Sequence, residues 1–172
     1  MKKQIRKNIF ETNSSSTHSI VIGNNGEDIY ADLPKQLEFH GDEFGWEHEL
    51  HTDTQSKANY LFTSLIYTHD PYGYMERIKE ILSKWGIEAT FDEIVKKKYD
   101  SGYVRYDTAN GDYVDHGDEN TDLVKALCED EALLMNYLFS DGSYVETSND
   151  NGDYDTLGSE PKNVMLDYYK GN

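Results

Sequence analysis

Apolar residues recur at helical spacing in two neighbouring segments of the chain. In the first segment they follow the i, i+3, i+4, i+7, i+8 pattern of one helix face, at Ala58, Leu61, Phe62, Leu65 and Ile66. Polar side chains at residues 52–54 can cap this helix. The second segment starts near residue 74, and its apolar face consists of Ile78, Ile81, Leu82 and Trp85. The pattern predicts two helices, separated at Asp70-Pro71.

Shorter apolar runs near both ends of the chain predict strands, at residues 5–10, 18–22 and 143–146. The run at 164–169 fits a strand or a helix. Residues 103–107 and 112–114 flank an Asn-Gly turn and predict a hairpin. Residues 122–128 and 131–139 predict one helix or two short ones. Strands at both ends with helices between them predict one α+β domain over residues 1–172, with an antiparallel sheet and about three to four helices.

Composition places the chain among folded, strongly acidic proteins. It has 172 residues, 16 basic against 33 acidic side chains and a formal net charge of -17. High charge with only 37% hydrophobic residues is typical of disorder, but 13% aromatic residues argue for a packed core. The single cysteine, Cys128, excludes a disulfide scaffold. No apolar run predicts a membrane span or a signal peptide, so we expect a cytosolic protein.

The acidic residues are concentrated after residue 100, where 16 of them stand against 4 basic residues and tyrosines are interleaved. Such a surface repels nucleic acid, because nucleic-acid binding needs clustered lysine and arginine. It attracts a basic protein surface instead. The candidate binding residues are Asp107, Asp112, Asp115, Asp118, Glu119, Asp150, Asp153 and Asp155, with Tyr113 and Tyr154 as aromatic anchors.

Small polar side chains are most dense in one loop near the start of the chain. It comprises Thr12, Asn13, Ser14, Ser15, Ser16, Thr17 and His18. Hydroxyls and backbone N–H groups in such a loop can hold an anion, and His18 can activate a serine. Ser, Thr and Asn also favour tight turns that bond to themselves, and we favour this structural interpretation.

Three histidines, His40, His48 and His51, fall close together among carboxylates. Imidazole and carboxylate suit zinc, manganese or iron. Their spacing matches no established metal motif, so they are weak metal candidates and we expect no cofactor.

Three segments carry a resemblance to known proteins. The opening Phe10-Glu11-Thr12-Asn13-Ser14-Ser15-Ser16-Thr17-His18-Ser19 resembles the start of a family of uncharacterised proteins from Firmicutes and their bacteriophages. Residues 41–47, and residues 138–139 with 143–151, are similar to two further segments of that family. The family brings no assigned activity, so the resemblance implies a phage-type origin and, with it, the cytoplasm of a bacterial host cell. Small acidic phage proteins include inhibitors of restriction and CRISPR nucleases, and this resemblance implies an anti-CRISPR-type role.

Two hypotheses follow. The first is a non-enzymatic phage-type protein that inhibits a bacterial defence nuclease, a Cas effector or a restriction enzyme, by occupying its basic nucleic-acid-binding surface. It needs no direct contact with nucleic acid and no membrane. The alternative is a metal-dependent or serine-loop hydrolase or ligand-binding domain, which uses Ser14–Ser16 and His18 with His40, His48 and His51.

Overall fold

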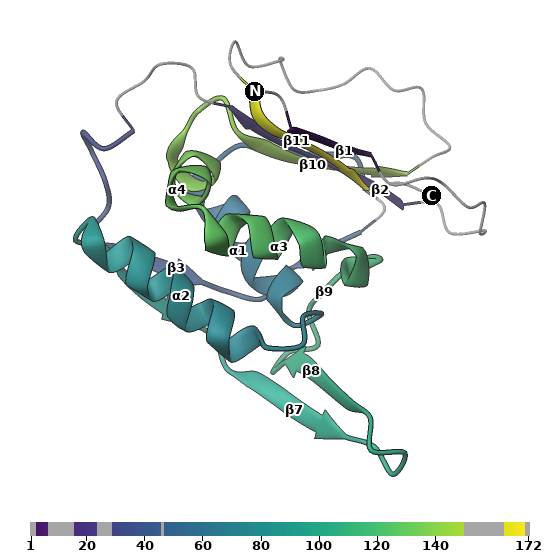
Figure 1. Ribbon diagram of the computed structural model, residues 1–172. Helices are drawn as coiled ribbons and strands as arrows, with labels where there is room; N and C mark the ends of the chain where they lie inside the picture. Colours follow the sequence, from purple (N-terminus) through teal and green to yellow (C-terminus); the bar gives the residue numbers. More distant parts are fainter. Residues whose placement is uncertain (1–2, 7–15, 24–28, 46, 150–163, 171–172) are drawn as a thin grey trace.

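The computed structural model describes residues 3–6, 16–23, 29–45, 47–149 and 164–170. The fold is α+β, as the sequence predicted (Figure 1). The described helices are α1 (Thr54–Leu65), α2 (Pro71–Lys84), α3 (Thr121–Glu129) and α4 (Glu131–Phe139), with a 3-10 turn, η1, at Gly117–Asn120.

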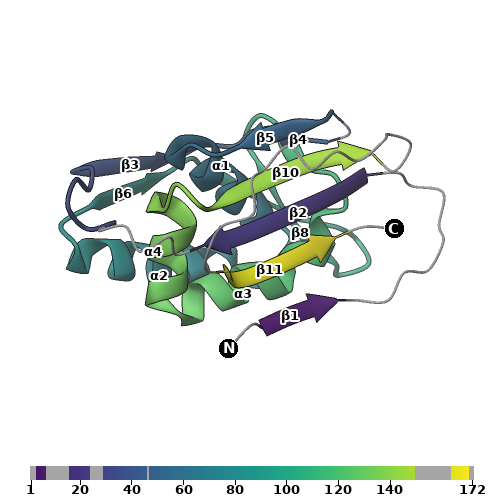
Figure 2. The ribbon, with the colours of Figure 1, turned by 90° about the horizontal axis from the view of Figure 1, so that it is seen from above.

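The main sheet has five strands in the order β1-β11-β2-β10-β5. They are β1 (Lys3–Arg6), β2 (Ser16–Gly23), β5 (Glu49–His51), β10 (Tyr144–Asn149) and β11 (Val164–Lys170). β1 pairs parallel to β11, and the other neighbours are antiparallel. Figure 2 shows that strands from the two ends of the chain lie side by side in this sheet. The run at 164–169 is therefore a strand.

The remaining strands form three separate pairs. β3 (Gln36–Phe39) pairs parallel to β6 (Glu88–Phe91), and β4 (Glu43–Phe44) pairs parallel to β9 (Tyr113–Val114). β7 (Ile94–Lys98) and β8 (Val104–Thr108) form an antiparallel hairpin. The predicted hairpin between residues 103–107 and 112–114 is wrong, because β8 pairs with the preceding strand, β7. The turn at Gly111, which has φ +81°, leads into β9, which pairs with β4.

The four described helices lie on one side of the main sheet (Figure 1). α4 contacts β2, and α1 contacts β10 and β3, while α2 packs on β6 and α3. The buried apolar side chains form one continuous cluster between these elements. The β7–β8 hairpin projects from the end of the molecule away from the main sheet.

Aspartate side chains start three of the helices. Asp53 accepts a hydrogen bond from Ser56 N at 2.9 Å, and Asp70 accepts one from Gly73 N at 3.1 Å. Asp130 accepts one from Leu133 N at 3.1 Å. Since Asp130 has extended backbone and caps a new helix, residues 121–139 form two helices rather than one. None of the helices in the described ranges combines the length and apolar character needed to cross a membrane.

Candidate functional site

Several carboxylates lie in or near β3, β4 and β5, around His40, Gly41 and His51. Residues 36–53 contain no lysine or arginine, and the strand pairings bring Asp92, just after β6, and Asp112, just before β9, to the same segment. We call this set the acidic edge; it consists of Glu38, Asp42, Glu43, Glu49, Asp53, Asp92 and Asp112.

His40 joins two carboxylates at the centre of the acidic edge. Its Nδ1 lies 3.0 Å from Asp92 Oδ1, and its Nε2 lies 3.1 Å from Glu38 Oε2. Asp92 Oδ2 also accepts a hydrogen bond from Gly41 N at 3.1 Å. The hydrogen bond to Asp92 is the main reason why the pKa of His40 is raised, since it favours the protonated ring.

The β4–β9 pair brings three predicted binding residues, Asp112, Tyr113 and Asp115, to the acidic edge. Tyr113 lies opposite Glu43, and its side chain is 40% exposed. The Asp112 carboxylate lies against the backbone of Gly41, where a Cβ would find no room. Asp115 N donates to the Phe44 carbonyl at 2.8 Å, which fixes the adjoining turn.

His51 lies behind the same surface and is mostly buried. Burial lowers its pKa, and the negative fields of Glu49, Asp42 and Asp53 oppose that effect. Its ring meets Phe44 edge-on, with centroids 5.2 Å apart. The carboxylates of Asp42, Glu49 and Asp53, which lie in or next to β4 and β5, therefore all act on one imidazole. They lie close together in space.

The acidic edge differs from the helices in how its charges are compensated. On the helices, carboxylates pair with lysine or arginine, as in Arg77–Glu80 at 3.0 Å and Lys79–Glu76 at 2.8 Å. Across the described ranges, the ion pairs of the acidic edge are to histidines only. Sequence reasoning missed most of these residues, although the absence of lysine and arginine from residues 36–53 was a visible signal.

Asp107, another predicted binding residue, is engaged within the β7–β8 hairpin. Its carboxylate lies 2.6 Å from Lys97 Nζ and 2.8 Å from Arg105 Nε. The hydrogen bond from Lys97 is the main cause of its lowered pKa. Asp118 and Glu119 lie in η1. Asp150, Asp153, Tyr154 and Asp155 lie outside the described residues.

The serine-rich loop is described only at its end. Residues 12–15 lie outside the described ranges, Ser16 begins β2 and Thr17 is buried. His18 is fully buried, and its Nδ1 lies 2.8 Å from the Tyr60 hydroxyl. Asn120 Nδ2 donates to that hydroxyl and to Ser64 Oγ, each at 3.0 Å.

These contacts hold the His18 ring from the core side. Its Nδ1 lies against the Tyr60 hydroxyl, which Asn120 also contacts. Nδ1 therefore faces the helices and the core, and a reaction with a loop serine would have to use Nε2.

The three candidate metal-binding histidines do not converge. His40 contacts Glu38 and Asp92, whereas His48 Nε2 lies 3.0 Å from Glu146 Oε1. His51 Nε2 lies 3.5 Å from Glu49. In the part of the chain that the structure describes, no group of three or more His, Cys, Asp or Glu residues is arranged to hold a metal ion.

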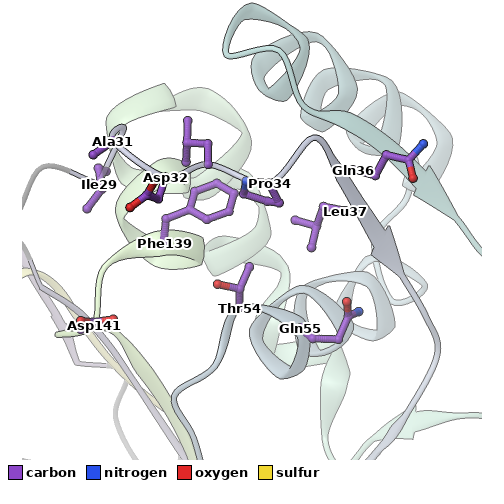
Figure 3. Close-up of a pocket in the computed structure, with 11 residues that line it drawn as sticks. Ile29, Ala31, Asp32, Pro34, Gln36, Leu37, Thr54, Gln55, Phe139 and Asp141 are labelled. Carbon is purple, nitrogen blue, oxygen red and sulfur yellow. The ribbon is translucent and has the colours of Figure 1, made fainter.

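A hollow of about 680 Å³ lies between the segment before β3, the start of α1 and the end of α4 (Figure 3). Figure 3 shows Phe139 beside Asp32 and Pro34, with Asp141 lying apart from them. Thr54 donates its hydroxyl to the Leu138 carbonyl at 3.0 Å. The lining of the hollow is about equally polar and apolar, and its described residues include no paired nucleophile and base.

Comparisons with protein-family models, with curated proteins and with solved structures found no match to this chain. The acidic edge must therefore be interpreted from its own chemistry.

Proposed function

We propose that the chain is a phage-type binding protein that inhibits a bacterial defence nuclease, a Cas effector or a restriction enzyme, by occupying its basic nucleic-acid-binding surface. The observation that carries the proposal is the acidic edge, whose carboxylates pair only with histidines in the described residues. A surface of this kind presents negative charge much as a nucleic-acid backbone does.

Electrostatics supports this kind of partner over a neutral one. A net charge of -17 steers a basic surface toward the molecule and speeds their encounter. Complementary charges also reject partners of the wrong sign. Because these charges are exposed, binding should weaken as salt concentration rises.

Tyr113 would supply the aromatic contact at the centre of the interface. It stands on β9 beside Glu43 and Asp112, and much of its ring is exposed. Tyrosine is enriched at the energetic centres of interfaces, where surrounding contacts exclude water. A tyrosine ringed by carboxylates fits a basic surface that contains an apolar pocket.

The test is binding and inhibition against a panel of purified Cas effectors and restriction enzymes. Asp42→Lys with Glu43→Lys reverses two exposed charges of the acidic edge. We expect affinity for the target to fall about a hundredfold and inhibition to be lost, since each lost charge contact costs roughly 1–3 kcal/mol. Binding is measured by biolayer interferometry, and inhibition by cleavage of a labelled substrate.

Glu76→Lys with Glu80→Lys on α2 is the matched control, because it makes the same change in net charge away from the acidic edge. This control should keep most of the affinity. If both double variants lost affinity equally, net charge alone would explain binding, and the acidic edge would not be the binding surface. A chain that neither binds nor inhibits any member of the panel would refute the proposal.

A further inference from the structure

The β7–β8 hairpin is a basic element in an acidic protein. Residues 94–108 contain Lys96, Lys97, Lys98 and Arg105 against two aspartates. Figure 1 shows the hairpin extending away from the helices and the main sheet. A local positive region therefore projects from a chain whose net charge is -17.

The charged side chains on the two faces of the hairpin have different partners. On one face, Asp107 pairs with both Lys97 and Arg105. On the other face, strand alternation places Lys96 and Lys98 together. Lys96 Nζ lies 5.8 Å from the centre of the Tyr106 ring, a cation–π arrangement that leaves the charge in place.

The tip of the hairpin exposes two aromatic rings. Tyr99 and Tyr103 flank the turn, with ring centroids 5.8 Å apart, and Tyr103 is 63% exposed. Gly102 closes the turn with φ +83°, and its N–H donates to the Tyr99 carbonyl at 2.9 Å. A short, hydrogen-bonded turn thus holds both rings in water, where burial against a partner would be favourable.

Beside the hairpin lies a hollow of about 310 Å³, between β8 and the residues that follow α1. It is lined by Ile66, Tyr67, Thr68, Tyr103, Val104, Arg105 and Tyr106. Gly117 packs so closely on the Tyr67 ring that no Cβ would fit there. The hollow therefore combines three tyrosines, and its volume is at the lower end of the size range for small-ligand sites.

We propose that this hollow binds a base of a single-stranded nucleic acid, with Lys96 and Lys98 contacting the adjacent phosphates. Tyrosine faces stack on any base, and interleaved cations follow the backbone. An acidic peptide would need the cations but would leave the exposed Tyr103 ring without a base stacked on it. The site therefore fits a nucleic-acid base together with its adjacent phosphate.

The site is compatible with the high negative charge elsewhere. At physiological salt the screening length is about 8 Å, so exposed charges on distant parts of the surface act weakly at the hairpin. Net charge led us to expect no contact with nucleic acid, and the hairpin is a local exception to that expectation. The inference does not depend on the acidic edge.

The test is fluorescence anisotropy of a labelled eight-nucleotide single strand with the full chain at 150 mM salt. We expect a dissociation constant of roughly 10–100 µM, typical of non-specific binding. Tyr103→Ala should weaken it about tenfold, Tyr103→Phe should retain it, and Lys98→Glu should weaken it severalfold. Tyr30→Ala and Lys125→Glu are matched controls elsewhere on the surface and should bind like the parent chain.

Competitors distinguish the ligand classes. Poly-glutamate that displaces the strand as well as an unlabelled strand does would overturn the proposal, because charge alone would then suffice. If a free mononucleotide competes as well per site as the unlabelled strand does, the hollow binds nucleotides. The proposal that it binds a single strand would then be overturned. Asp42→Lys with Glu43→Lys should leave the Tyr103→Ala effect unchanged, so failure at the acidic edge and failure at the hairpin are separable.

Discussion

Lys57 offers a quantitative test of how this fold holds a buried charge. It lies on α1 and is only 1% exposed. Its Nζ donates to the carbonyls of Ser140 and Ser143, each at 3.2 Å, and so satisfies backbone acceptors just after α4. Burial lowers the pKa of Lys57 from 10.5 to about 8, and the fields of Asp141 and Asp53 offset only part of this.

The lowered pKa has a definite effect on stability. Protonated Lys57 costs the folded state about 3 kcal/mol relative to an unfolded chain with the ordinary pKa. Below pH 8 this cost is present in full. Between pH 8 and 10.5 the unfolded chain binds more protons than the folded chain, so stability rises with pH. About 2 kcal/mol of the cost should be relieved between pH 7 and pH 9.5.

The assay is urea unfolding of the parent chain and of Lys57→Met, followed by tryptophan fluorescence at pH 7, 8, 9 and 9.5. The difference between the two chains isolates Lys57, because Cys128, whose buried thiol has its pKa raised to about 12, titrates alike in both. Between pH 7 and pH 9.5, the free energy of unfolding of the parent chain should rise by about 2 kcal/mol relative to that of Lys57→Met. Lys125→Met, at an exposed site, should show no such trend. A difference that stays flat would refute the reasoning.

Three further changes test other parts of the structure. Tyr60→Phe removes the hydroxyl that links the buried histidine and asparagine, and should cost about 1–3 kcal/mol in urea unfolding. Gly117→Ala should cost about 1–3 kcal/mol by overpacking the adjacent tyrosine ring, whereas Gly45→Ala, with space for a Cβ, should be nearly neutral. By NMR titration, the His40 midpoint should lie above 6.5 and fall toward it in Asp92→Asn.

Local signals predicted the helices well and the strand partners poorly. Helical spacing found α1 and α2, and the polar residues 52–54 found the start of α1, because those signals act over one or two turns. The start of α2 was predicted near residue 74, whereas Asp70 caps the helix and Pro71 begins it. The β7–β8 hairpin was missed, since Ile94 and Val95 are the only aliphatic residues of β7 and the following lysines give no alternation. The parallel pair β4–β9 joins residues about seventy positions apart, and no local pattern encodes such a pairing.

The candidate site shows the same division between local and distant information. Composition predicted an acidic interface that includes Asp112, Tyr113 and Asp115, but it also included Asp107, which the hairpin cations neutralise. Only strand pairing brings residues 36–53 beside β9. The histidines are another case: they are close in sequence, yet alternation and turns direct His40 and His48 to different partners.

The uncompensated charge of the acidic edge is a cost to the fold. Like charges held together repel each other and destabilise the compact state. Elsewhere the chain avoids that cost, as at Lys84–Glu131 and Lys125–Glu129. Strained or repulsive arrangements that persist beside well-compensated ones are expected at functional sites.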